Sequence, residues 1–86
     1  MTNSEKLFLI LAEELNFRRA AARAFLSQQG LSDHIRRLEG CYGTPLFYRR
    51  PRVSLTPAGE AVQRTLQRVK NLESGLEAEL AELEEG

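Results

Sequence analysis

The sequence predicts a mainly α-helical domain with one small β-hairpin and a long final helix. Three observations support this fold class. Apolar residues recur at helical spacing in three short segments, two strand-like pieces flank a proline-containing tip, and the apolar residues of the last segment repeat at heptad spacing. A chain of 86 residues holds one domain with a thin core, so regular helices or a second copy of the chain are expected to stabilise it.

Each of the three short segments begins at a residue that suits the N-cap of a helix, where a side-chain oxygen accepts a hydrogen bond from a free backbone N–H. The expected caps are Ser4, Asn16 and Ser27. The first two helices are expected to end near Leu15 and Phe25, and the third at the glycines Gly40 and Gly43. Only Leu26 and Ser27 separate the second helix from the third, which is the spacing of a helix-turn-helix. The apolar faces of the three helices consist of Leu7, Phe8, Leu11, Ala12, Phe17, Ala20, Ala21, Ala24, Leu31, Ile35 and Leu38.

The second half of the chain predicts a hairpin followed by the long helix. Residues 45–49 and 53–55 are the expected strands, with Pro51 at the tip between them. Thr56 and Pro57 then begin the last helix as N-cap and first helical residue. Its heptad seam is longer than anything else in the chain can cover, so a second copy is the expected partner. The seam consists of Val62, Leu66, Val69, Leu72, Leu76, Leu80 and Leu83.

A net charge of zero hides a strong asymmetry along the chain. All 12 Lys and Arg residues lie within residues 1–70 together with 6 acidic residues, and the other 6 acidic residues lie within residues 71–86. This pattern is typical of a body that binds a polyanion and carries an acidic tail, with an ordinary solvated surface as the alternative.

Several classes of protein are argued against by the residues that the chain lacks. His34 is the only histidine and Cys41 the only cysteine, so neither a multi-histidine metal site nor an intrachain disulfide is expected. A nucleophilic pair of these two residues has no third group to orient it. No apolar run approaches the roughly 20 residues that span a bilayer. We therefore expect a cytoplasmic protein that is not an enzyme, has no membrane segment, and binds no metal or cofactor.

The face of the third helix that points away from the core carries side chains suited to the major groove of DNA. It consists of Gln28, Gln29, Ser32, Asp33, Arg36 and Arg37. Glutamine pairs with adenine, serine bonds several base edges, and arginine serves guanine or phosphate. Asp33 would repel phosphates, and we expect it to pair with Arg36 or Arg37 one turn later. The alternative is the polar outer face of an ordinary soluble helix.

Arginines elsewhere extend this positive surface. Arg49, Arg50 and Arg52 surround the proline of the hairpin tip, where they can straddle a phosphate backbone or enter a minor groove. Protection of the sheet edge by charge is the alternative. On the second helix, phosphate contacts that set register without reading sequence are expected from Arg18, Arg19 and Arg23.

The residues also match a known family. The matching motifs are Phe17-x-x-Ala20-Ala21, Ser27-Gln28, Leu31-Ser32, Ile35, Leu38-Glu39, Gly43, Leu46-Phe47-x-Arg49 and Leu55-Thr56-Pro57-Ala58-Gly59. From about Leu7 to Leu83 the chain resembles the N-terminal DNA-binding domain of LysR-type transcriptional regulators. The resemblance implies a winged helix-turn-helix over residues 1–56 and a linker helix over residues 57–86. It also implies a homodimer, with the linker helices usually antiparallel, that binds imperfect inverted repeats in double-stranded DNA near promoters.

Carried over onto this chain, the resemblance places Gln28, Gln29, Ser32 and Asp33 at the contacts of the recognition helix. Ser27 matches the serine that begins that helix, and Arg50 and Arg52 lie in the wing. The chain departs from the family's usual residues at Arg18, Ala24, Gly30, Asp33 and His34. These departures concern the DNA sequence that is bound more than the fold.

The family normally continues into an effector-binding domain. This chain is therefore expected to be either an excised domain or a stand-alone form, and a small-molecule effector is expected only if the parent protein has that domain. Two other functions remain open on the residues alone. One is a coiled-coil module that binds an acidic protein, and the other is a nucleic-acid binder without sequence preference.

Overall fold

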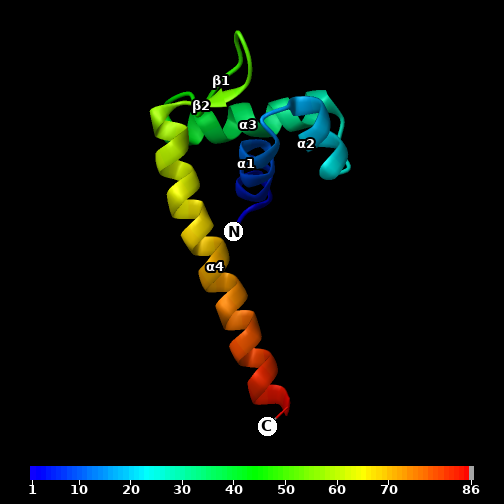
Figure 1. The fold of residues 1–86 in the computed structure, drawn as a ribbon, viewed down its shortest axis with the longest axis vertical. Helices are drawn as coiled ribbons and strands as arrows, with labels where there is room; N and C mark the ends of the chain where they lie inside the picture. The colour runs from blue at the N-terminus through cyan, green and yellow to red at the C-terminus, as the bar shows by residue number, and fades with distance from the viewer. Residues whose placement is uncertain (86) are drawn as a thin grey trace.

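The computed structural model describes residues 1–85 as a helical head from which one long helix extends. The molecule measures 53 × 26 × 19 Å, and its length comes from the last helix (Figure 1). The elements in chain order are α1 (Asn3–Glu14), α2 (Phe17–Arg23), α3 (Gln28–Tyr42), β1 (Phe47–Tyr48), β2 (Ser54–Leu55) and α4 (Pro57–Glu85). This is the predicted fold class, with both the hairpin and the long final helix present.

Of the caps predicted for the three short helices, two are confirmed and the first is wrong. Asn16 Oδ1 accepts from the backbone N–H of Arg19 at 2.9 Å, and Ser27 Oγ accepts from Gly30 N–H at 3.0 Å. The cap of α1 is Thr2, not Ser4. Thr2 Oγ1 accepts from Glu5 N–H at 3.1 Å while the Glu5 carboxylate accepts from Thr2 N–H at 2.7 Å, so two free donors are satisfied reciprocally.

Ser4 instead lies inside α1 and faces the third helix. Its hydroxyl lies 3.2 Å from Nδ1 of His34, in a hydrogen bond that joins the start of α1 to the middle of α3. The histidine that departs from the family's usual residue therefore has a partner within the head.

The predicted end of the second helix needs correction, and the third helix ends at the second of the two glycines expected there. α2 stops at Arg23, so four residues rather than two separate it from α3, and Phe25 in this turn has a left-handed backbone with φ of 57°. α3 continues past Gly40 to Tyr42 and ends at Gly43, whose φ of 72° suits a glycine. Gly40 weakens a helix but does not stop it, because its backbone N–H and C=O still extend the ladder.

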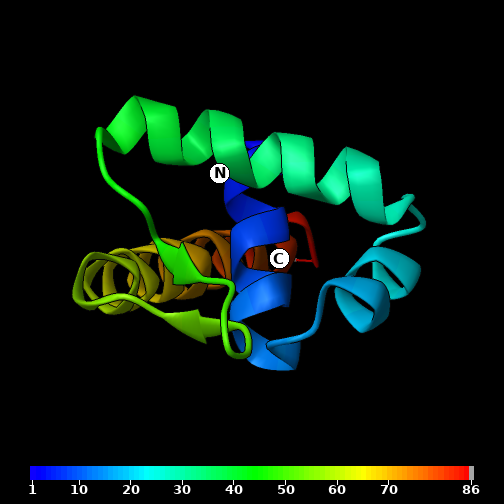
Figure 2. The same cartoon turned by 90° about the horizontal axis from the view of Figure 1, so that it is seen from above.

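The core of the head surrounds α1. Seen from above, α3, α2 and the hairpin form a ring around this helix (Figure 2). Phe8 of α1 lies at the centre, and its ring centroid is 5.3 Å from that of Phe47 on β1. Burying one such side chain stabilises the fold by about 1.5–3 kcal/mol. The buried apolar residues are Leu7, Phe8, Leu9, Leu11, Ala12, Ala20, Ala21, Leu31, Ile35, Leu38, Leu46, Phe47 and Leu66.

The junction between the hairpin and α4 is tightly packed. The two antiparallel strands pair Phe47 with Leu55, and the next residue, Thr56, is buried. Thr56 Oγ1 accepts from Gly59 N–H at 2.9 Å and donates to the carbonyl of Pro45 at 2.8 Å, so the predicted cap also ties α4 to the start of the hairpin. A Cβ on Gly59 would overlap the carbonyl of Leu46, so this position requires glycine.

The heptad seam of α4 divides into two parts. Leu66 is only 4% exposed and belongs to the core of its own chain, with Val62 packed against that core. The expectation that Leu66 lies in a seam between two chains is therefore corrected. Val69 is half-buried, and the last four residues of the seam are exposed, at Leu72 (74%), Leu76 (56%), Leu80 (50%) and Leu83 (70%). We call these four residues the bare stripe.

Candidate nucleic-acid interface

A shallow groove of about 310 Å³ lies between the outer face of α3, the start of α2 and the hairpin. It brings together residues from all three elements of the predicted DNA-binding surface. They are Phe17, Gln28, Gln29, Ser32, Arg36, Arg49 and Val53. Five of these seven were predicted as site residues, and the two apolar ones, Phe17 and Val53, form part of the lining between them.

The polar face of α3 points to solvent as predicted. Gln28, Gln29, Arg36 and Arg37 are exposed, and Ser32 is half-buried. Among the side chains that the structure describes, those of residues 1–84, neither arginine of this face takes part in an ion pair, so both guanidinium groups are open to an external anion. The hydroxyl of Ser27 is occupied by the cap of α3, which makes this serine a structural residue as well as a candidate contact.

Asp33 does not pair with either arginine. Its Oδ1 accepts a hydrogen bond from Nε2 of Gln29, one turn earlier on the same face, at 3.0 Å. The predicted pairing with Arg36 or Arg37 is therefore wrong. Both partners are exposed, so this contact orients two side chains that face away from the core.

Arg49 is held by the head rather than free at the wing. Its guanidinium donates to Glu39 Oε1 at 3.3 Å and lies over the ring of Phe17, 5.4 Å from the centroid. Arg49 lines the groove, but part of its charge is neutralised by this carboxylate. Arg49 therefore fixes the wing on α2 and α3. Its contact with DNA stays a prediction.

Glu39 is the functional residue that sequence reasoning did not single out. Its Oε2 accepts from the backbone N–H groups of Leu46 at 2.7 Å and Phe47 at 3.2 Å, while Oε1 accepts from Arg49. One half-buried carboxylate thereby anchors the first strand to α3. The Leu38-Glu39 motif marked the position without indicating these partners.

Three more of the predicted arginines are open. Arg50 and Arg52 are exposed at the hairpin tip, which projects beyond the rest of the head (Figure 1), and Arg18 is exposed on α2. None of these three forms an ion pair with another residue in the described part of the chain. They remain available for phosphate.

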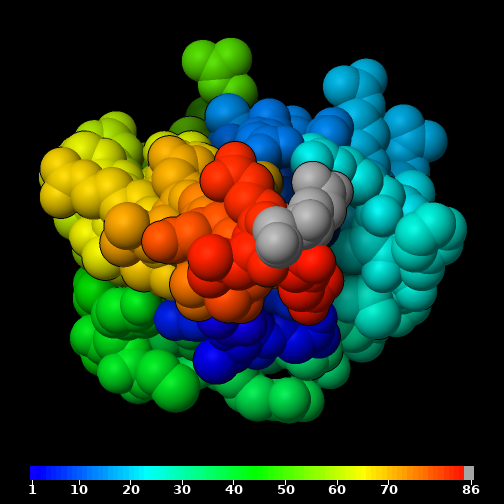
Figure 3. Space-filling view, turned by 90° about the horizontal axis from the view of Figure 1, so that it is seen from below, coloured from blue at the N-terminus to red at the C-terminus, as the bar shows by residue number. Residues whose placement is uncertain are grey.

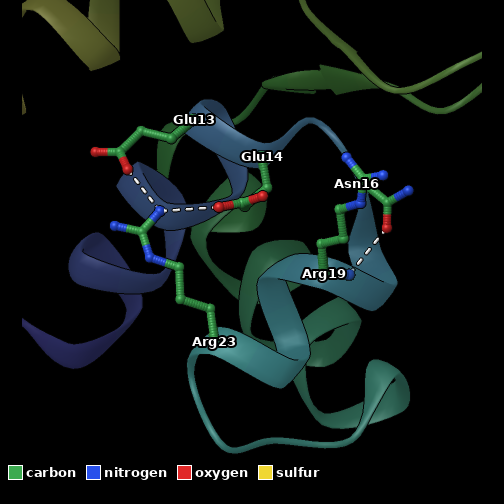
Figure 4. A network of polar contacts seen from close by, with 5 residues as sticks. All are labelled: Glu13, Glu14, Asn16, Arg19 and Arg23. Atoms are coloured by element: carbon green, nitrogen blue, oxygen red, sulfur yellow. Dashed lines mark hydrogen bonds and ion pairs between the residues drawn. The ribbon is translucent and has the colours of Figure 1, made fainter.

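Arg23 differs from its neighbours on α2. Its Nη1 donates to Glu13 Oε2 at 2.6 Å and to Glu14 Oε2 at 3.1 Å, and both carboxylates belong to α1 (Figure 4). These hydrogen bonds, that to Glu13 first, raise the pKa of Arg23 above its ordinary value. The expectation that Arg23 contacts phosphate is corrected, because its charge is balanced within the chain.

Comparison with known proteins identifies the family. Residues 3–60 match the family described as "Bacterial regulatory helix-turn-helix protein, lysR family". The chain belongs to the LysR family. The match covers α1 to α3, the hairpin and the first residues of α4, and so includes every residue that lines the groove.

Individual LysR-family relatives agree with this assignment. The chain is 49% identical over 65 residues to the HTH-type transcriptional regulator XapR of Escherichia coli, covering 74% of this chain and 22% of XapR. It is 44% identical over 57 residues to the uncharacterized HTH-type transcriptional regulator YkuM of Bacillus subtilis, covering 65% of this chain and 20% of YkuM. The aligned segment thus spans about a fifth of the length of these relatives.

Solved structures of LysR-family proteins have the same fold. Full-length OxyR of Pseudomonas aeruginosa superposes with a TM-score of 0.79 at 38% identity, covering 96% of this chain and 28% of OxyR. DarR of Vibrio fischeri in complex with DNA gives 0.83 at 30% identity, covering 99% and 30% of the two chains. A BenM DBD structure with catB site 1 DNA gives 0.91 at 24% identity, with 100% and 98% covered, and shows likeness of fold.

The opposite end of this LysR-family chain carries a different surface. The view from below shows α4 with the N-terminal part of α1 beside it (Figure 3). The α-amino group of Met1 lies 3.0 Å from Glu73 Oε2, so α4 is tied to the start of the chain at this point. The bare stripe begins one residue before this contact and continues along the exposed end of α4.

Two further findings concern metal sites and membrane segments. In the part of the chain that the structure describes, no three His, Cys, Asp or Glu side chains come close enough to hold a metal ion. None of the described helices is long and apolar enough to cross a membrane.

Proposed function

We propose that this chain binds double-stranded DNA as a homodimer and regulates transcription from promoters with inverted-repeat sites. The observation that carries the proposal is the groove, in which the exposed glutamines and Arg36 of α3 lie beside the wing. The DarR structure, a complex with DNA at 30% identity, supports DNA binding by this fold. The family match is to a regulatory helix-turn-helix protein, so we propose a regulator without catalytic activity.

The groove and its rim suggest a division of roles. Gln28, Gln29 and Ser32 contact base edges in the major groove, where amide and hydroxyl groups distinguish bases. Arg36 and Arg37 lie further along α3 and contact guanine or phosphate. Arg18 on α2 and the wing arginines at positions 50 and 52 contact the phosphate backbone or the adjacent minor groove. The first group sets specificity, and the other two supply most of the salt-dependent affinity.

The bare stripe supports the homodimer. The four exposed leucines of one α4 can pack against those of a second α4. Burying one of them removes its apolar area from water and stabilises the dimer by about 1.5–3 kcal/mol. The dimer presents two copies of α3 to successive major-groove faces, so affinity depends on the spacing of two half-sites, about 34 Å apart. In this arrangement residues 1–56 bind DNA and residues 57–86 join the subunits, with the first turns of α4 also completing the head.

The proposal places the protein in the bacterial cytoplasm, where its DNA target lies. An effector molecule enters only through a further domain, since the aligned relatives are about five times as long as the aligned segment.

A selection from random duplex DNA with the purified 86-residue chain, at roughly 0.15 M salt, tests the proposal. We expect enrichment of a motif with two half-sites and a steep fall of affinity with salt. Binding without enrichment would favour a sequence-blind binder. The absence of any binding would favour a coiled-coil module that meets an acidic protein through its arginines.

A further inference from the structure

The hydrogen bond between Gln29 and Asp33 bears on which base this chain reads, given the proposed function. The two side chains lie one turn apart near the start of α3, and Gln29 Nε2 donates to Asp33 Oδ1 at 3.0 Å. The helix has a second carboxylate, Glu39, but that one faces the hairpin. Asp33 is therefore the acid that accompanies the base-reading residues of α3.

The bond restricts what the Gln29 amide can offer to DNA. A glutamine amide has two N–H donors and one oxygen acceptor with which to meet a base. With one N–H directed at Asp33, the amide keeps one donor and its Oε1 acceptor. The free pair is thus one donor beside one acceptor, and rotation of the amide that exchanges N and O would break the bond to the carboxylate.

This donor and acceptor pair matches one base in the major groove. Adenine presents N7 as an acceptor and the N6 amine as a donor, whereas guanine presents two acceptors, N7 and O6, that need two donors. The carboxylate of Asp33 adds a second bias, because it repels the guanine O6 and is indifferent or attractive toward an amine. We propose that Asp33 is a specificity-determining residue, which positions Gln29 to read adenine and to reject guanine.

Asp33 bonds Gln29 although two arginines without ion-pair partners lie nearby on the same helix. Arg36 and Arg37 lie three and four residues later and are exposed, yet within residues 1–85 neither is paired with Asp33. The carboxylate thus acts on the amide, while the two guanidinium groups stay available for DNA. Asp33 is a positioning residue in this scheme, and Gln29 makes the base contact.

The test uses the motif recovered by the selection, with all four base pairs placed in turn at each position of one half-site. Affinities are measured for the wild-type chain and for Gln29→Ala, Asp33→Ala and Asp33→Asn. For the wild type we expect one position to prefer A·T over G·C by about tenfold, as a bidentate amide contact provides. Gln29→Ala should abolish preference at that position and leave the rest of the motif intact.

The two Asp33 variants separate positioning from charge. Asp33→Ala should lower the preference for A·T over G·C at that position to below about threefold, because the amide then offers both N–H groups to guanine. Asp33→Asn keeps an oxygen at Oδ1 and should keep most of the preference for A·T. Both variants remove a negative charge and should raise affinity on all sequences alike. Residue 33 is exposed, so matched thermal melts are expected for all variants.

Three outcomes would overturn the inference. A wild-type chain that prefers G·C or no base at the Gln29-dependent position would do so, as would an Asp33→Ala variant that retains the tenfold preference. A third is a preference for C·G that depends on Asp33 and not on Gln29, because Asp33 would then contact the base itself. Failure of the proposed function looks different, since no motif would be enriched at all.

Discussion

The two halves of α4 carry one heptad pattern and have opposite surroundings. Leu66 in the first half is 4% exposed, while Leu76 and Leu80 in the second half are 56% and 50% exposed. The first half lies against the head, and the second extends beyond it (Figure 1). A heptad pattern therefore predicts which face of a helix is apolar. Whether that face is covered by the same chain or by another depends on where the helix meets the head.

The arginines divide in the same way. Arg23 and Arg49 are bound by carboxylates of the head, whereas Arg36 and Arg52 have no such partner among the described side chains of residues 1–84. Arg36 lines the groove and Arg52 lies at the hairpin tip, at the end of the molecule away from the bare stripe. These unpaired arginines and the exposed leucines thus mark two separate surfaces, one polar and positive and the other apolar.

The largest effect is expected from shortening a buried side chain in the first half of α4, which packs in the core of its own chain. Leu66→Ala should lower the free energy of unfolding by about 2–5 kcal/mol, because it leaves a cavity in the core. Urea denaturation at two protein concentrations measures this. Leu72→Ala is the matched control, and at a concentration where the chain is monomeric it should change stability by less than about 0.5 kcal/mol. Equal losses for both variants would contradict the division of the seam.

The second prediction concerns the half that the chain leaves bare. Replacing Leu76 and Leu80 together by alanine should weaken the dimer by at least about tenfold in Kd, since each leucine loses apolar area buried against the partner. Analytical ultracentrifugation measures the dimer, and circular dichroism checks that the head stays folded. An unchanged Kd would show that the bare stripe does not join two chains.

The third prediction concerns Glu39, whose carboxylate holds the wing on α3. Glu39→Ala should cost about 1–3 kcal/mol, because two backbone N–H groups of the hairpin lose their acceptor. Glu39→Gln keeps an oxygen acceptor and loses the ion pair with Arg49, so its loss should be smaller. Chemical denaturation orders the three proteins, and a glutamine variant as unstable as the alanine variant would assign the effect to the ion pair instead.

The smallest effect is expected from a comparison of two arginines, one without an ion-pair partner and one with two. Arg52→Ala should reduce the slope of log K for DNA against log salt by about one, as expected for the loss of one phosphate contact. Arg23→Ala should leave that slope unchanged, since Glu13 and Glu14 already balance its charge. Fluorescence anisotropy on one duplex at several salt concentrations compares the two. Equal changes in slope would mean that the Arg23 ion pairs open on binding.

Local chemistry made much of the fold predictable. The caps at Asn16, Ser27 and Thr56 follow from side chains that bond a backbone group three residues away, so sequence alone carries the signal. The cap of α1 was mispredicted because Thr2 and Ser4 are both suitable, and Glu5 decides between them by completing the capping box.

Contacts between distant elements were not predictable in the same way. The burial of Leu66 depends on the angle at which α4 crosses α1, and Glu39 finds its partners in a strand that begins eight residues later. Asp33 had acceptable partners at Gln29, Arg36 and Arg37, and side-chain geometry selected the uncharged one. The face of α3 was predictable, because it depends only on helical periodicity. The partner that each charged side chain of α3 takes was not predictable.

The close contact at Gly59 has a consequence for the length of the DNA target. Because the Gly59 backbone touches the Leu46 carbonyl and Thr56 is bonded to Pro45, no slack separates the wing from α4. In the proposed dimer, each α3 is then held rigidly relative to its α4. The distance between the two copies of α3 is therefore fixed. A site whose halves are moved by half a helical turn cannot be met by stretching the protein, so the DNA itself would have to bend or twist to fit.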